Sequence, residues 1–197
     1  MKRLTITLTI FLVLLGAMPA SADVPTDWIS VRQMLTAPDN QDFSIFDQEL
    51  LPDVLIDIIE NDPEEAEYHE WVMSSALRQI GKLRVERSVE LLVSHIADYS
   101  EICIYWLGTY TGPESIDALV GYLADESASL RYESAYSLST LPDPEDEVPD
   151  GLMNSLNNAV LMVSERLGVE DDLDVVDALN DAITRLSELQ AGILSTE

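Results

Sequence analysis

The chain contains an internal repeat with a short, fixed period. Residues 81–98 align with residues 108–125 without a gap, at an offset of 27 residues. The matched pairs include Ser88/Ser115, Val89/Ile116, Leu92/Leu119, Val93/Val120, Ile96/Leu123, Ala97/Ala124 and Asp98/Asp125. Such a period is typical of proteins in which one supersecondary unit stacks on the next. The repeat therefore predicts a stacked architecture and favours a binding role.

Apolar residues after residue 44 recur with the helical period, and no segment alternates with period two. The expected helices cover residues 52–61, 64–80, 85–97, 100–107, 113–124, 127–141, 152–167 and 173–190. Proline and glycine mark several ends. Pro52 and Pro113 fit first helical turns, and Gly81 and Gly108 fit C-terminal stops. The sequence thus predicts an all-α fold of four antiparallel helix hairpins.

The two ends of the predicted stack differ from its middle. Residues 26–35 favour a short helix with Trp28, Val31 and Leu35 on one face, which would cover the first hairpin. The last hairpin is longer, and each of its helices carries an apolar stripe. The stripes are Leu152, Leu156, Val160, Val163 and Leu167, then Leu173, Val176, Leu179, Ile183 and Leu186. Asp172 precedes the final helix, where the helix dipole favours negative charge.

The unit that spans residues 108–141 has the most regular pattern. Its first helix ends with Leu119, Leu123 and Asp125, and its second contains Leu130, Arg131, Ala135 and Leu138. This pattern resembles the HEAT-like helical repeat family, and the resemblance covers residues 50–141. In the two preceding units, Glu70 and Ser100 stand where Arg131 stands here. The resemblance implies a right-handed α-solenoid of about four hairpins, HEAT- or armadillo-like, whose second helices line a concave partner-binding face.

The N-terminus predicts export. Residues 1–22 combine a basic start, an apolar run and the small-residue sequence Ala20-Ser21-Ala22, which is typical of a cleavable signal peptide. The mature domain would cover residues 23–197, with an N-terminal cap at 23–47, HEAT-like repeats at 48–141 and a C-terminal hairpin at 149–190. No later run is apolar enough to cross a bilayer. We expect a periplasmic or extracellular protein with no membrane contact after cleavage.

The charge is strongly acidic. The whole chain has a net charge of −27, from 37 acidic and 10 basic residues. Residues 23–197 hold every acidic residue and eight basic ones, so their net charge is −29. Such a charge repels nucleic acid and anionic membrane surfaces. It favours solubility, cations or a basic partner.

The sequence contains no recognisable catalytic motif. His69 starts a segment like a zinc-protease helix, but Met73 stands where the second histidine would be. Cys103, the only cysteine, and His95 could meet across a hairpin as a nucleophile pair, which leaves an enzyme as an alternative. The acidic loop 143–150 could bind divalent cations weakly, which leaves a cation-stabilised structural protein as another. We expect no cofactor and no dedicated metal site.

The second helices carry the candidate binding residues. Placing Leu77, Leu107 and Leu138 at one core position puts Trp71, Glu101 and Tyr132 in one outward row. Ser75, Tyr105 and Tyr136 form the next row, one turn later. Aromatic residues of this kind anchor interfaces. The candidate partner-binding residues are Trp71, Glu101, Tyr105, Tyr132, Glu133 and Tyr136. The alternative is that the rings pack between neighbouring repeats.

These observations together favour a non-enzymatic, exported protein–protein interaction module. It would act as a scaffold or adaptor that binds a protein or peptide, with a basic partner as one option, on its concave face.

Overall fold

The computed structural model describes residues 26–37, 41–85, 87–144 and 148–195. Within these residues the regular secondary structure is helical, with no strand, so the predicted all-α class is confirmed. The helices are α2 (Trp28–Leu35), η1 (Phe43–Ile45, a 3-10 helix), α3 (Leu51–Asn61), α4 (His69–Leu83), α5 (Ser88–Ser94), α6 (Ser100–Leu107), α7 (Pro113–Tyr122), α8 (Ala128–Ser139), α9 (Leu152–Leu167) and α10 (Leu173–Leu194). The expected signal peptide at 1–22 and positions 145–147 of the acidic loop lie outside the described residues.

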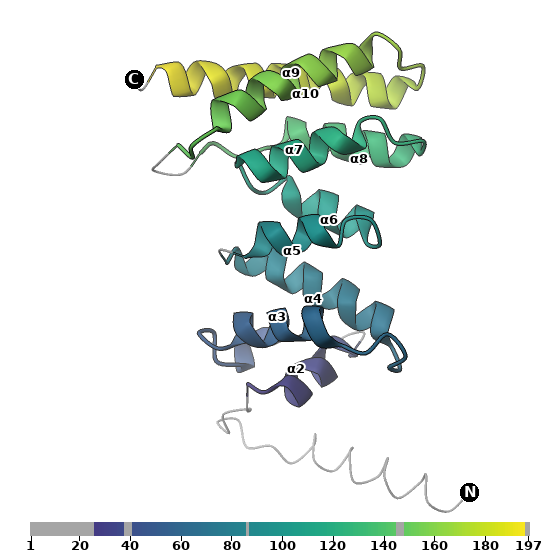
Figure 1. The fold of residues 1–197 in the computed structure, drawn as a ribbon, viewed down its shortest axis with the longest axis vertical. Coiled ribbons are helices and arrows are strands. Elements are labelled where there is room, and N and C mark those ends of the chain that lie inside the picture. Colours follow the sequence, from purple (N-terminus) through teal and green to yellow (C-terminus); the bar gives the residue numbers. More distant parts are fainter. Residues whose placement is uncertain (1–25, 38–40, 86, 145–147, 196–197) are drawn as a thin grey trace, which may run out of the picture.

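The helices are layered along the long axis of the molecule, from α2 at one end to α9 and α10 at the other (Figure 1). The four expected hairpins pair α3 with α4, α5 with α6, α7 with α8 and α9 with α10, and all four pairs are in contact. The second helices α4, α6, α8 and α10 also contact one another in series. Extensive contacts therefore join each described helix only to helices one or two positions away along the chain.

The N-terminal helix α2 packs on α3 and α4 and buries Val31 and Leu35. Its Arg32 guanidinium donates to the Asp62 carboxylate, and His69 Nδ1 lies 2.9 Å from Asp62 Oδ2. Burial alone would raise the pKa of Asp62, but the hydrogen bonds from Arg32 and His69 outweigh it and lower that pKa. These polar contacts fix α2 against the start of α4.

The prediction that Gly81 stops the second helix is wrong. Helix α4 continues through Gly81 to Leu83, and Arg84 ends it in the left-handed conformation, with φ of 50°. A Cβ atom at Gly81 would lie 2.5 Å from Cγ of Trp106 on α6. The glycine is therefore needed for close approach of α4 and α6 rather than for a turn. Helix α5 is also shorter than expected, since it covers Ser88–Ser94 rather than 85–97.

The predicted apolar stripe of α10 is partly wrong. Leu173 is 77% exposed, although it was expected to face α9. The residues that α10 buries are Val175, Ala178, Leu179, Ala182, Leu186, Leu189 and Ile193. Because α10 packs on both α8 and α9, its buried face is wider than a single stripe and includes alanines. Asp172 caps this helix, as expected, by accepting bonds from the backbone N–H groups of Asp174 and Val175.

A buried ion cluster joins α8 to the turn between α9 and α10. The Glu170 side chain is fully buried and accepts two hydrogen bonds from Arg131, at 2.8 and 2.9 Å. Arg166 donates two more, at 2.8 and 2.6 Å. Arg131 also donates to the backbone oxygens of Asp125 and Glu126. The hydrogen bonds from Arg131 are the main reason that the pKa of Glu170 lies far below its usual value.

Replacing this carboxylate should destabilise the fold strongly. We expect Glu170→Gln to lower the free energy of unfolding by about 3–5 kcal/mol at pH 7, because it leaves a buried Arg131 charge without its partner. Since the pKa of Glu170 is lowered on folding, its contribution is complete above the usual pKa of 4.5 and declines as the pH falls below it. Urea titrations at several pH values should therefore show the gap between the two proteins narrowing in acid.

The matched control is Glu165→Gln, an exposed position on α9, which should change stability by less than about 0.5 kcal/mol. Equal effects of the two substitutions would show that the cluster does not hold the last hairpin in place.

Candidate partner-binding surface

The four candidate aromatic residues on the second helices are exposed. Trp71, Tyr105, Tyr132 and Tyr136 have exposed fractions of 49%, 58%, 37% and 48%. The three leucines that define the register, Leu77, Leu107 and Leu138, are each 0% exposed. Glu101 is exposed and Glu133 is half-buried. The expected outward orientation of the rings is therefore observed, which leaves them available to a partner.

The predicted row of exposed residues Ser75, Tyr105 and Tyr136 does not extend to α4. Ser75 was expected to be exposed, but it is buried and accepts a hydrogen bond from Gln41 Nε2 at 3.3 Å. Gln41 belongs to the segment between α2 and α3, so this segment contacts α4 at Ser75, whereas Tyr105 and Tyr136 at the equivalent positions of α6 and α8 are exposed. Sequence alignment of repeats missed this effect because it belongs to the chain end. In place of Ser75, α4 presents Arg78 and Lys82, which are both exposed.

Three hollows follow one another along the second helices. The first lies between α4 and α6 and includes Arg78, Lys82 and Tyr105. The second lies between the starts of α6 and α8, and it shares Glu101 and Ile102 with the first. The third lies between α8 and α10, and it shares Ser129 with the second. We call the surface that carries these hollows the second-helix face.

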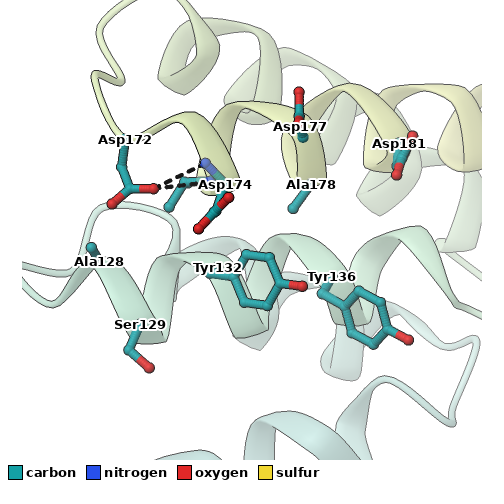
Figure 2. A pocket seen from close by; sticks show the side chains of 10 residues that line it. Ala128, Ser129, Tyr132, Tyr136, Asp172, Asp174, Asp177, Ala178 and Asp181 are labelled. Atoms are coloured by element: carbon teal, nitrogen blue, oxygen red, sulfur yellow. Dashed lines mark hydrogen bonds between the residues drawn. The ribbon is translucent and has the colours of Figure 1, made fainter.

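The hollow between α8 and α10, which we call the α8–α10 groove, has a volume of ≈ 580 Å³. Tyr132 and Tyr136 stand side by side on α8, and their rings are stacked with centroids 6.1 Å apart and planes 14° apart (Figure 2). Val175 and Ala178 of α10 are buried beside them. The acidic lining residues are Asp172, Asp174, Asp177 and Asp181. The groove thus combines an aromatic wall, an apolar floor and a row of carboxylates.

The aspartates of the groove were missed by sequence reasoning. A signal existed, because Asp174, Asp177 and Asp181 have the spacing i, i+3, i+7 that places residues on one helix face. The apolar stripe expected for this helix does not include these three residues. That these aspartates line the same groove as two tyrosines of α8 depends on tertiary packing, which the spacing does not reveal.

Most basic side chains are engaged within the molecule. Arg32, Arg87, Arg131, Arg166 and Arg185 all form ion pairs with acidic side chains. These are five of the eight basic residues after residue 22. Across the described residues, no basic side chain forms an ion pair with an aspartate of the α8–α10 groove. The charges of Asp174, Asp177 and Asp181 are therefore open to an external cation, whereas Asp172 also interacts electrostatically with Arg131.

The only cysteine is not poised for catalysis. Cys103 is 0% exposed, and burial raises the pKa of its thiol to about 12. The His95 ring nitrogen Nδ1 lies 2.9 Å from the backbone oxygen of Leu91 and 3.0 Å from Ser94 Oγ. The enzyme alternative requires an exposed, easily ionised thiol, and Cys103 has neither property.

Both histidines line a separate hollow of ≈ 640 Å³ near the N-terminal end, together with Asp62, Glu70 and Asp98. His69 is engaged with Asp62 in the contact that fixes α2 against α4. Among the described residues, no three or more His, Cys, Asp or Glu side chains are grouped so that they could hold a metal ion. The same part of the chain has no helix of the length and hydrophobicity that a bilayer span requires.

Comparison of the chain with known protein families, curated proteins and solved structures found no match. The site must therefore be interpreted from its own geometry.

Thiol reactivity provides a direct check on the Cys103 environment. At pH 8 we expect a thiol-specific reagent to modify native Cys103 at least about 100-fold more slowly than the urea-unfolded chain, because a thiol with a raised pKa ionises little. The measurement is the absorbance change on reaction with an aromatic disulfide reagent. Equal rates in the two states would show that the Cys103 thiol is accessible and ionises readily, as the enzyme alternative requires.

Proposed function

We propose that this protein is a non-enzymatic interaction module, a scaffold or adaptor that binds a protein partner on its second-helix face. In this proposal the stack is a right-handed, HEAT-like α-solenoid of about four helix pairs, and the second-helix face is its concave surface. The observation that carries the proposal is the set of exposed aromatic residues on α4, α6 and α8, of which Tyr105, Tyr132 and Tyr136 line hollows in a series that shares lining residues.

The contact pattern supports this proposal. Repeat proteins are held together by contacts between neighbouring units, which leaves one continuous surface along the stack for binding. Here each described helix makes its extensive contacts with helices that are one or two positions away along the chain. Large amphipathic rings such as Tyr105 and Tyr136 lose little conformational entropy on binding, which is why they are frequent anchors of interfaces.

The proposal includes export to the periplasm or the extracellular space. This part rests on the signal-like sequence of residues 1–22. An exported scaffold without an internal disulfide is consistent with a single cysteine in a continuous apolar core.

Two substitutions on the face test the proposal. We expect Tyr105→Ala and Tyr136→Ala each to weaken binding of the native partner by about 1–3 kcal/mol, because each removes an exposed anchor ring. The folded state should be almost unaffected. Affinity capture of the partner from the native compartment, followed by titration of the captured protein, measures the loss.

Two leucines provide the controls. Leu161→Ala removes an exposed side chain from α9, outside the second-helix face, and should leave both binding and stability unchanged. Leu119→Ala removes a fully buried side chain of α7 and should cost about 2–5 kcal/mol of stability through a cavity. If Tyr105→Ala unfolds the protein as strongly as Leu119→Ala does, its ring belongs to the core and the proposal fails.

A further inference from the structure

We propose that the α8–α10 groove binds a lysine- or arginine-rich segment of the partner in an extended conformation. The inference rests on the proposed function and names the chemistry of the partner at one place on the second-helix face. It follows from three features of the groove: its aromatic wall, its aspartates without a described ion-pair partner and the length of the aspartate row along α10.

The aromatic wall suits a cationic side chain. Stacked Tyr132 and Tyr136 are both exposed, so their rings are accessible to a ligand. Ring faces attract ammonium and guanidinium groups within about 6 Å of the centroid. The molecule already uses this contact elsewhere, since Arg32 lies 5.6 Å from the Trp28 centroid and Arg84 lies 5.1 Å from that of Tyr110. The Tyr132–Tyr136 pair offers the same kind of surface to an external cation.

The carboxylates define the charge of the occupant. Asp174, Asp177 and Asp181 lie on one face of α10, where like charges three or four residues apart repel one another. Asp172 adds a fourth carboxylate at the N-terminal end, although its Oδ1 also caps the helix. A bound cation would relieve this repulsion and should therefore stabilise the folded state.

The dimensions favour a peptide over a single ion. Asp174 and Asp181 are separated by roughly 10 Å along the helix axis, at 1.5 Å per residue. Basic residues at alternate positions of an extended chain recur about every 6.6 Å, so two of them fit within this row. The apolar stems of lysine or arginine would pack against the tyrosine rings, Val175 and Ala178, while their charged ends reach the carboxylates.

The test uses a nine-residue peptide in which arginine alternates with alanine, titrated into the full chain by calorimetry at about 150 mM salt, where long-range attraction is screened. We expect measurable binding and a rise in melting temperature. The double substitution Asp177→Asn/Asp181→Asn should weaken binding at least tenfold, and Tyr136→Ala should weaken it severalfold. Both positions of the double variant are exposed, so the variant should fold.

The matched control is Asp53→Asn/Asp117→Asn, which changes the net charge equally but lies on the exposed sides of α3 and α7. It should weaken binding less than twofold. If the two double variants lose equal affinity for the peptide, binding depends only on the net charge of the protein, and the inference is wrong. Binding of spermine as tightly as the peptide would also overturn it, since a polyamine has no peptide backbone.

The two proposals fail in different ways. If the wild-type chain does not bind the peptide while Tyr105→Ala still loses the native partner, the interaction module stands and the α8–α10 groove is not its basic-segment site. If the peptide binds as expected while neither tyrosine variant loses a partner, the groove is a cation-binding site but the proposed second-helix interface is wrong.

Discussion

The structure depends on packing between neighbouring helices, because the extensive contacts of each described helix are made with helices one or two positions away along the chain. In a globular domain, distant parts of the chain share one core; here each layer is completed by the next. Serial packing has a direct consequence for the surface. It places α4, α6, α8 and α10 in contact one after another, so their outward residues form one continuous face. On this face Tyr105, Tyr132 and Tyr136 are exposed, whereas Ser75 of α4 is buried and bonded to Gln41.

A second constraint is the small number of basic residues. Five of the eight that come after residue 22 lie in ion pairs, and two of these, Arg131 and Arg166, serve the buried Glu170. A buried carboxylate needs such partners, because a lone buried charge is far more costly than an exposed one. The internal requirement for arginine leaves the aspartates of α10 without a described ion-pair partner. The acidity of the α8–α10 groove thus follows from how the fold places its few cations.

Much of the fold could be predicted from the sequence where local signals are strong. Proline at first turns and apolar periodicity located α3, α7 and α9 closely, and the register of Leu77, Leu107 and Leu138 correctly predicted that Tyr105 and Tyr136 are exposed. The failures have a common physical cause. Gly81 was interpreted as a helix stop because its real role, making room for Trp106, depends on a contact 25 residues away. Ser75 was misplaced because Gln41, in the segment between α2 and α3, contacts it, and Leu173 was misplaced because α10 packs on α8 and α9 through other residues.

The candidate site was predicted in part for the same reason. The exposure of Tyr132 and Tyr136 follows from repeat alignment, since Tyr136 occupies the position of Tyr105 on α6 and Tyr132 lies one turn earlier on α8. The facing aspartates belong to the last hairpin, which diverges from the repeats, and only packing of α10 on α8 brings them opposite Tyr132 and Tyr136. Alignment of the repeats therefore predicts the tyrosine side of the α8–α10 groove, whereas the aspartate side could be identified only from the tertiary structure.

Hydrogen exchange tests serial packing most directly. Leu186 is fully buried on α10, so Leu186→Ala opens a cavity in the last layer only. If stability is transmitted from layer to layer, mass-resolved amide exchange should show loss of protection in α8, α9 and α10, and protection in α2, α3 and α4 should stay at the wild-type level. An equal loss of protection along the whole chain would contradict serial packing, and with it the physical basis of the second-helix face.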